Sequence, residues 1–369
     1  MRVLIACGGT GGHLFPGLAV AEMLQQRRHE VKLLVSEKAI DQAALSALTN
    51  NSGASAITVQ PVGAIGYTGS RGLMRFCSRL WQAVGDCGDV CRQFEPHVVL
   101  GMGGFTSAPA VIAGKRRKGT VTVIHESNAV PGKANRWSGK LADHIAVGVA
   151  DCAKFFGHKP VTVTGTPIRQ ALRHGKVTGA HARLGLQSDR LTVLVMGGSQ
   201  GARSLNDAMA AALPWLTDWR ERTQFVHLTG ARDEAALRAA YEASGYKANV
   251  MSFCSEMELP YSAADLVIAR SGAATLTELA TFGLPAILIP YPHAAGDHQS
   301  HNARVMERAG AARRIDEAPV RLDSQLLAAE IGALLDDDKT RAGMSAAARS
   351  LAVNDAAERI ANLVETYAN

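Results

Sequence analysis

The chain has 369 residues, of which 47% are hydrophobic and 20% charged, and its formal net charge is +6. This length exceeds what one hydrophobic core usually holds, so two domains are expected, and the composition is that of an ordinary soluble globular protein without long disordered segments. No apolar run approaches the roughly 18 residues that a membrane-spanning helix needs. The six cysteines form no CxxC pair and are expected to be reduced thiols of a cytoplasmic protein.

The first half of the chain alternates short apolar runs with helical patterns, which predicts a parallel sheet covered on both faces. Its first run leads straight into glycines without a cleavage site, so it indicates a strand and not a signal peptide. Helices are expected between the strands, for example at Leu14–Arg28 and Thr106–Lys115. The predicted strands are Val3–Cys7, Val31–Val35, Ala56–Val59, Val98–Gly101, Val121–His125, Ile145–Gly148 and Val161–Thr164.

The second half repeats this plan after a polar linker at Gly165–Ser188. Strands are predicted at Leu191–Met196, Gln224–Leu228, Val250–Phe253, Leu266–Ala269 and Ala286–Ile289. We therefore predict an α/β fold of two Rossmann-like, doubly wound parallel-sheet domains that face a cleft, where ligands of such sheets bind. The domains are expected at residues 1–167 and 168–369, and the return of the last helix to the first domain is left open.

Charge differs between the halves. Residues 1–170 hold 19 Lys/Arg against 10 Asp/Glu, whereas residues 171–369 hold 20 against 23. A basic first domain predicts contact with something anionic, for which nucleic acid and anionic lipid both fit at this level. The alternative is that this difference in net charge between the two halves has no function.

The first strand ends in the glycine turn Gly8–His13. A dinucleotide fingerprint fails because Leu14 stands where the third glycine belongs, and a phosphate loop fails because no lysine follows. The next helix would point free N–H groups at an anion. Its N-terminus disfavours an imidazolium, so His13 is a candidate proton acceptor. A role in bracing the loop is equally open.

Further glycine and polar clusters follow other strands. Gly101–Pro109 could receive a second phosphate group, and His125–Asn128 places polar side chains at a strand end, where they are usually functional. In the second half, the strand–turn–helix at Arg270–Glu278 would bring helix N–H groups to a diphosphate. Glu278, expected in the first helical turn, could accept two ribose hydroxyls. Helix capping is the alternative for this residue.

Two clusters could hold a metal, but both signals are weak. Asp297 precedes His298 and His301, and Asp336–Asp338 contains an Asp-x-Asp pattern that fits a solvated turn better. No metal and no other cofactor is therefore predicted.

A membrane-facing helix is predicted within Ile65–Val84. Leu73, Phe76, Leu80 and Trp81 form an apolar stripe, and Arg71, Arg75 and Arg79 are interleaved with it. Such a pattern fits a helix lying on an anionic membrane surface. An ordinary core-facing stripe is the alternative.

Taken in order, these motifs resemble the MurG family of peptidoglycan N-acetylglucosaminyltransferases, which has the GT-B fold. The resemblance covers most of the chain, from Gly8 to Asn302. Each matching segment alone is weak, but the ordered set is specific. The segments are Gly8–His13, Gly101–Gly104, His125–Asn128, Gly197–Arg203 and Arg270–Ala273.

The resemblance implies an inverting transfer of N-acetylglucosamine from UDP-N-acetylglucosamine to the 4-hydroxyl of the N-acetylmuramic acid of lipid I. This undecaprenyl-diphosphate-linked muramyl peptide would become lipid II, for cell wall synthesis and hence cell shape and division. It implies a peripheral protein on the inner face of the cell membrane, with an anionic membrane surface but no nucleic acid as partner. His13 and then Glu126 are the implied candidates for the base.

The implied binding residues fall into two groups. The acceptor diphosphate would lie at Gly103, Gly104 and Phe105. The donor would be bound by Thr10, Gly11, Gly12, Asn128, Arg169, Ser199, Cys254, Ala273, Ala274, Thr275, Leu276, Thr277, Glu278 and Gln299. Ser127, Thr166 and Cys254 depart from the residues usual in the family. A transferase for another acceptor, a sugar-nucleotide epimerase and an inactive nucleotide-binding or scaffold protein remain rival interpretations.

Overall fold

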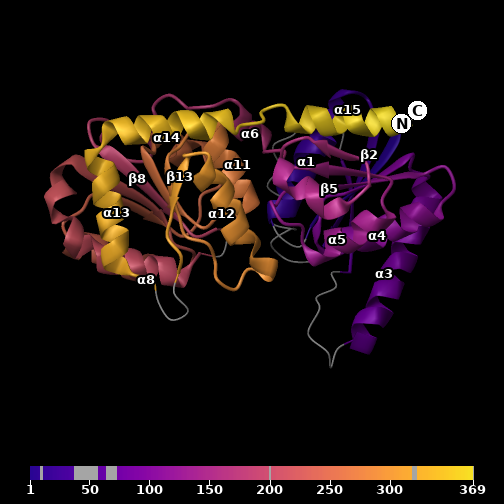
Figure 1. Ribbon diagram of the computed structural model, residues 1–369, viewed down its shortest axis with the longest axis horizontal. Helices are drawn as coiled ribbons and strands as arrows, with labels where there is room; N and C mark the ends of the chain where they lie inside the picture. The colour runs from indigo at the N-terminus through magenta and orange to yellow at the C-terminus, as the bar shows by residue number, and fades with distance from the viewer. Residues whose placement is uncertain (9–10, 37–56, 64–72, 199–200, 318–321, 369) are drawn as a thin grey trace. The chain divides into compact units, whose positions relative to one another are not determined.

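The computed structural model describes residues 1–8, 11–36, 57–63, 73–198, 201–317 and 322–368, although not the side chains of residues 73–76. The chain divides into two compact units. Unit 1 comprises Met1–Arg169 and Asn354–Asn369, and unit 2 comprises Gln170–Val353. The sequence placed the boundary between residues 167 and 168, whereas the structure places it after Arg169. The last helix belongs to unit 1 (Figure 1).

Unit 1 is built on a seven-stranded parallel sheet with strand order β3-β2-β1-β4-β5-β6-β7. Its strands are β1 (Arg2–Ala6), β2 (Glu30–Ser36), β3 (Thr58–Val62), β4 (Val98–Gly101), β5 (Val121–Glu126), β6 (His144–Val147) and β7 (Val161–Val163). Its helices are α1 (Gly11–Gln26), α3 (Leu73–Phe94), α4 (Gly104–Arg116), α5 (Lys133–Leu141), the 3-10 helix η2 (Ala150–Phe156) and α15 (Ala356–Ala368).

Both faces of this sheet are covered, as its largely apolar central strands require. Successive side chains of a strand point to opposite faces. Val3 and Ile5 pack with α1 and α15 on one face, whereas Leu4 and Ala6 pack with α3 and α4 on the other. All four side chains have no exposed surface. Figure 1 shows α1 and α15 on one side of β5, with α4 and α5 on its other side.

Unit 2 repeats the topology with a six-stranded parallel sheet of order β10-β9-β8-β11-β12-β13. Its strands are β8 (Leu191–Met196), β9 (Thr223–Leu228), β10 (Ala248–Met251), β11 (Leu266–Ala269), β12 (Ala286–Leu288) and β13 (Ala312–Arg314). Its helices are α6 (Gln170–Arg173), α7 (Ala180–Arg183), α8 (Arg203–Ala212), η3 (Leu213–Arg222), α9 (Glu234–Ala243), α10 (Glu258–Ala263), α11 (Ala273–Phe282), η4 (Ala295–Asp297), α12 (His298–Arg308), α13 (Ser324–Asp336) and α14 (Asp338–Ser350).

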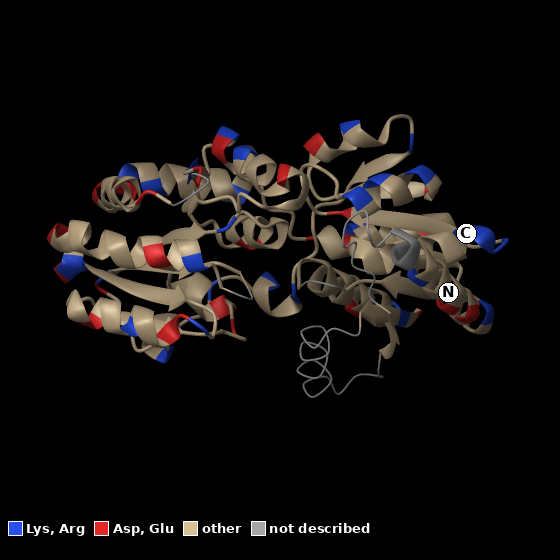
Figure 2. Cartoon of the chain, turned by 90° about the horizontal axis from the view of Figure 1, so that it is seen from below, with Lys and Arg blue, Asp and Glu red and all other residues tan. Residues whose placement is uncertain are grey.

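The core of unit 2 lies where Val193 and Val195 of β8 pack against α8, η3 and α13. On its surface, basic and acidic residues alternate along the helices (Figure 2). Ion pairs join Arg238 to Glu234 within α9 and Arg313 of β13 to Glu330 of α13. In the part of the chain that the structure describes, no helix is long and apolar enough to cross a membrane.

The predicted fold class, two doubly wound parallel sheets, is confirmed. The sequence missed β13, a three-residue edge strand with two arginines, and α5, whose buried residues are Asn135, Ser138 and Gly139. Two short helices, α6 and α7, lie in the predicted linker.

Candidate active site

The strand order of each sheet marks where a ligand is expected. The order changes direction between β1 and β4 in unit 1 and between β8 and β11 in unit 2. Ligands of open parallel sheets bind at the carboxyl ends of the strands at such a point. The glycine turns after β1, β4, β8 and β11 all lie at these ends. Each unit therefore carries its own candidate binding edge.

His13 lies in the first turn of α1 and is partly buried. Its Nδ1 is 3.1 Å from the carbonyl oxygen of Met102, just after β4. A carbonyl oxygen only accepts, so Nδ1 carries the proton, and in the neutral ring Nε2 is then the acceptor. The hydrogen bond thus joins two neighbouring glycine turns and selects the tautomer that a base acting through Nε2 needs.

Gly103 and Gly104 make room for this imidazole. Their φ angles are +100° and +75°, which favour glycine. A Cβ atom on Gly103 would lie 2.8 Å from His13 Nδ1, and one on Gly104 would lie 3.1 Å from the oxygen of Gly8. Both glycines are therefore needed for the turn to close over His13. Their predicted contact with a diphosphate, together with that of the exposed Phe105, stays a prediction.

Glu126, at the end of β5, is 2% exposed and fully engaged. Its Oε1 accepts from the backbone N–H and the side-chain Nδ2 of Asn128, at 2.9 and 2.8 Å. Its Oε2 accepts from the backbone N–H of Gly132 and from Asn135 Nδ2, at 3.0 and 2.9 Å. A carboxylate offers about four lone-pair sites. Four donors occupy them, so Glu126 shapes the loop after β5.

Asn135 is a buried member of this site that the sequence analysis missed. Its Nδ2 also donates to the carbonyl oxygen of His125 at 2.9 Å, and it would lie 3.2 Å from a Cβ on Gly103. The buried residues of α5 are Asn135, Ser138 and Gly139. Because this buried face is polar or glycine, it gives no apolar periodic signal, and this explains why both α5 and Asn135 were overlooked.

His125 is fully buried next to this loop. Its Nε2 donates to the carbonyl oxygen of Gly165 at 2.9 Å. Burial lowers the pKa of His125 below its usual value, although the bond to Gly165 opposes the shift. His125 is therefore neutral and serves to hold the end of β5 against the segment after β7.

Arg169 ends the first segment of unit 1, whereas its predicted place was in the second domain. Its guanidinium lies 4.7 Å from the ring centre of Phe15 on α1, a cation–π arrangement. This contact holds the Arg169 guanidinium beside Phe15, which follows Gly11, Gly12 and His13 near the start of α1. Two other predicted donor ligands, Thr10 and Ser199, lie outside the described residues.

In unit 2, α11 begins directly after the turn Arg270–Gly272. Gly272 is its N-cap and supplies no side-chain hydrogen bond, so the amide groups of the first turn are oriented toward the binding edge without a side-chain cap. Ala273, Ala274 and Thr275 are partly exposed, whereas the side chain of Leu276 is buried. Only the backbone of Leu276 can therefore contact a ligand.

Glu278 is the sixth residue of α11 and lies in its second turn, not in the first as predicted. The capping alternative needs a first-turn position and is wrong. Its Oε2 accepts a hydrogen bond of 2.7 Å from the hydroxyl of Tyr261. Thr277 bonds back to the carbonyl oxygen of Ala273, in the same helix.

Arg270 is a structural anchor at this edge. It is 6% exposed, and its Nη1 is 2.6 Å from Glu317 Oε2. The same atom donates to the carbonyl oxygens of Ile289 and Pro290 after β12, and Nη2 donates to Ser204 Oγ on α8. The buried ion pair thus ties the ends of several elements together.

Gln299 and Cys254 are the remaining residues predicted to bind the donor substrate. The side-chain hydroxyl of Ser271 donates to the carbonyl oxygen of Gln299, and Gln299 Oε1 accepts from the backbone N–H of Tyr291. These bonds fix the start of α12 beside the turn after β11. Cys254 is partly exposed and follows the end of β10, next to Phe253, which is 65% exposed.

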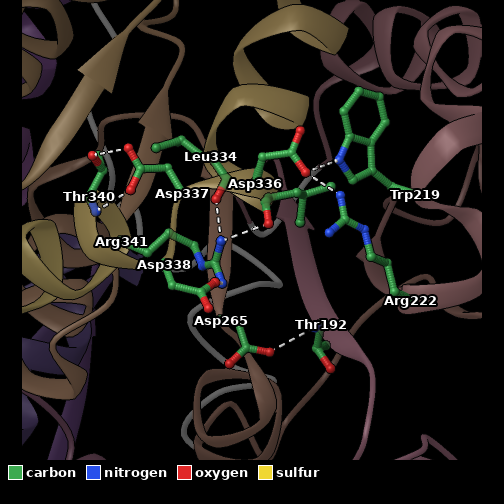
Figure 3. Close-up of polar contacts among 11 residues, drawn as sticks. Thr192, Trp219, Arg222, Asp265, Leu334, Asp336, Asp337, Asp338, Thr340 and Arg341 are labelled. Atoms are coloured by element: carbon green, nitrogen blue, oxygen red, sulfur yellow. Dashed lines mark hydrogen bonds and ion pairs between the residues drawn. The ribbon is translucent and has the colours of Figure 1, made fainter.

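Each carboxylate of the acidic run Asp336–Asp338 has a hydrogen-bond or ion-pair partner within the protein. Figure 3 shows its carboxylates turned to different groups. Asp336 accepts from Trp219 Nε1 at 3.0 Å and pairs with Arg222, and these contacts lower its pKa. Asp337 caps α14 through Thr340, and Asp338 pairs with Arg341. Within the described ranges, no three His, Cys, Asp or Glu side chains are grouped as a metal site would require, the Asp297, His298 and His301 set included.

The described residues of the predicted membrane stripe differ in burial. Leu80 packs against the core formed by α3 and α4 and is partly buried, as the core-facing alternative requires. Trp81 is 59% exposed, with the guanidinium of Arg116 5.0 Å from its ring centre, and Arg79 is exposed. Arg71 lies outside the described residues, as do the side chains of Leu73, Arg75 and Phe76.

Comparison with known proteins places these two edges in context. The model of the glycosyltransferase family 28 N-terminal domain matches residues 3–147, and that of the family 28 C-terminal domain matches residues 192–360. A protein of Syntrophus aciditrophicus is 39% identical over 356 residues, covering 95% of this chain and 94% of the relative. One of Syntrophotalea carbinolica is 39% identical over 363 residues, covering 98% and 97%. Both are named UDP-N-acetylglucosamine–N-acetylmuramyl-(pentapeptide) pyrophosphoryl-undecaprenol N-acetylglucosamine transferase.

Solved structures with the same architecture have more than one activity. The crystal structure of Acinetobacter baumannii MurG is 26% identical and superimposes with a TM-score of 0.76, covering 99% of each chain. A UDP-GlcNAc 2-epimerase from Neisseria meningitidis, bound to UDP-GlcNAc, has a TM-score of 0.73 at 13% identity, covering 99% of this chain and all of its own. Because the two differ little in TM-score, the fold alone does not separate transfer from epimerisation.

Proposed function

Because this chain belongs to glycosyltransferase family 28, we propose that it catalyses the reaction for which its relatives are named. It transfers N-acetylglucosamine from UDP-N-acetylglucosamine to a lipid-linked N-acetylmuramyl-pentapeptide, which converts lipid I into lipid II. The observation that carries this proposal is 39% identity over nearly the whole length of both chains. The 13% identity to the epimerase supports a common fold alone.

The donor is assigned to the binding edge of unit 2. Its diphosphate meets the N-terminal amides of α11, whose partial positive charge favours an anion, and Ser199 contacts the same group. The carboxylate of Glu278 accepts the ribose hydroxyls. Gln299 contacts the sugar, and the backbone at Cys254 contacts the uracil. From unit 1, we assign Arg169 to the departing diphosphate, and Thr10, Gly11, Gly12 and Asn128 to other groups of the donor.

His13 is assigned as the base. In an inverting transfer, the 4-hydroxyl of the acceptor attacks the anomeric carbon and loses its proton to a nearby base. The hydrogen bond from Nδ1 to Met102 leaves Nε2 as the acceptor for that proton. Glu126 has four donors around its two oxygens and is better suited to positioning. The backbone of Gly103, Gly104 and Phe105 receives the acceptor diphosphate.

We place the protein on the cytoplasmic face of the cell membrane as a peripheral protein. Trp81 of α3 and Arg116 of α4 form an exposed aromatic and basic surface on unit 1, and Arg79 of α3 is exposed as well. Aromatic rings favour the membrane interface and arginines favour anionic lipid. The lipid-linked acceptor provides the functional reason, because its carrier stays in the bilayer.

A turnover assay tests the reaction. With UDP-N-acetylglucosamine and the lipid-linked muramyl acceptor, we expect UDP and the disaccharide product in equal amounts. Formation of a C2 epimer without acceptor would support the epimerase interpretation. Transfer only to a different acceptor would support a related transferase, and UDP binding without any turnover would support an inactive binding protein. His13→Ala is the matched variant for the assigned base.

A further inference from the structure

The carboxylate of Glu278 has a buried partner that the donor site does not otherwise require. The hydroxyl of Tyr261 donates to Glu278 Oε2 at 2.7 Å and lies 3.6 Å from the sulfur of Met196. A tyrosine hydroxyl has one proton, and a charged oxygen is a stronger acceptor than a thioether. The hydrogen bond to Glu278 is therefore the dominant one.

Tyr261 cannot easily move. It comes from α10, is 0% exposed and packs its ring 5.3 Å from that of Phe282. Phe282 stands one turn after Glu278 on the same helix, so ring and hydroxyl both contact α11. Glu278 is only partly buried, so a fixed hydrogen-bond partner limits the rotamers that its long side chain samples. The hydrogen bond from an immobile ring reduces that freedom.

The identity of the buried residue adds to this argument. A phenylalanine would fill nearly the same volume of an apolar core without a polar atom, whereas burying a hydroxyl is costly unless it is hydrogen-bonded. Tyr261 uses one of the roughly four lone-pair sites of the carboxylate, and a carboxylate can accept from several donors at once. Ribose 2′- and 3′-hydroxyls are such donors.

We propose that Tyr261 is a positioning residue that holds Glu278 in the orientation needed to accept the ribose hydroxyls of a uridine nucleotide. By fixing this acceptor, it also sets the preference for ribose over deoxyribose in the donor. This inference rests on the proposed role of Glu278 in donor binding.

The test compares Tyr261→Phe with a matched control in calorimetric titrations with UDP and 2′-deoxy-UDP. Tyr241→Phe is the control, because Tyr241 is also fully buried in unit 2 and its hydroxyl contacts His227. We expect Tyr261→Phe to weaken UDP binding about ten-fold, as for loss of about 1.4 kcal/mol from a contact of a charged group. The preference for UDP over 2′-deoxy-UDP should shrink by a similar factor. Tyr241→Phe should leave both dissociation constants within twofold of wild type.

Glu278→Ala and the double variant separate positioning from packing. If Tyr261 acts through Glu278, Tyr261→Phe should have no further effect on UDP binding in the Glu278→Ala background. Equal weakening of UDP and 2′-deoxy-UDP, or an undiminished effect in that background, would overturn the inference. So would normal UDP binding by Tyr261→Phe when Glu278→Ala binds poorly, and the donor role of Glu278 would then stand. Normal UDP binding by Glu278→Ala would overturn both.

Discussion

Replacing Glu126 by glutamine should loosen the loop after β5. The carboxylate accepts two hydrogen bonds at each oxygen. An amide oxygen can replace one end, but the amide NH₂ would face two N–H donors at the other. Each lost bond to a charged group contributes about 1.5–3 kcal/mol, and water can partly replace it at the edge of a sheet. We therefore expect a local loss of about 3 kcal/mol.

Hydrogen exchange of the backbone amides of Asn128 and Gly132 measures this loss directly, because both donate to Glu126. A loss of about 3 kcal/mol corresponds to roughly 100-fold faster exchange if the loop opens locally. Glu95→Gln is the matched control. Its carboxylate is 56% exposed and pairs with Arg2 and Arg117 at 3.4 and 3.5 Å, so the two amides should exchange as in wild type.

The outcome distinguishes a positioning residue from a base. If Glu126 shapes the loop, faster exchange and lower turnover should occur together in Glu126→Gln. Exchange within threefold of wild type, together with a kcat reduced at least 100-fold, would refute the reasoning. The carboxylate would then take part in proton transfer despite its four donors.

Four further predictions concern other parts of the chain. His13→Ala should lower kcat by about 10²–10⁴-fold and abolish the acidic limb of the kcat–pH profile, while UDP affinity stays near that of the wild type. A near-normal kcat would mean that His13 only supports the loop. Burial lowers the pKa of His227 from 6.5 to about 3, so its stabilising contribution is complete above pH 6.5 and is lost as pH falls toward 3. Between pH 7 and 4.5, urea unfolding of the wild type should therefore lose about 2–3 kcal/mol more than His227→Asn. Turnover should persist in excess EDTA, and a loss of turnover that magnesium or manganese restores would contradict the prediction that no metal is needed. A triple variant with serine at Arg71, Arg75 and Arg79 should bind anionic vesicles more weakly, by about 1 kcal/mol for each arginine, and should keep its turnover on a soluble acceptor. Loss of that turnover would exclude a role in membrane binding alone.

The sequence predicted the central strands well because they are largely apolar runs that both sheet faces bury. Leu191–Met196 and Leu266–Ala269 match β8 and β11 to the residue. β13 was missed because Arg313 and Arg314 are paired with acidic residues and give no apolar signal.

The glycine turns were also recognisable, but what fills them was not. A glycine at position 103 indicates that another group lies close to the backbone there, and only the structure shows that this group is the imidazole of His13. The bonds from Asn135 to Glu126 and from Tyr261 to Glu278 join residues on different elements. Local patterns do not report such tertiary contacts. The position of Glu278 in the second turn depended on where α11 begins, and helix boundaries are the least certain part of a sequence pattern.

The membership of α15 in unit 1 has a consequence for how the chain is made. Ala357, Ile360, Ala361 and Val364 of α15 are buried in the same core as Val3 and Ile5 of β1. A ribosome that has released residues 1–169 has therefore not yet supplied every part of that core. All of unit 2 is synthesised before α15 emerges, so unit 2 can complete its folding first, against the usual N-terminal-first order. A gene fragment cut after residue 169 should accordingly yield a chain in which α1 alone covers that face of the sheet and part of its apolar surface stays exposed.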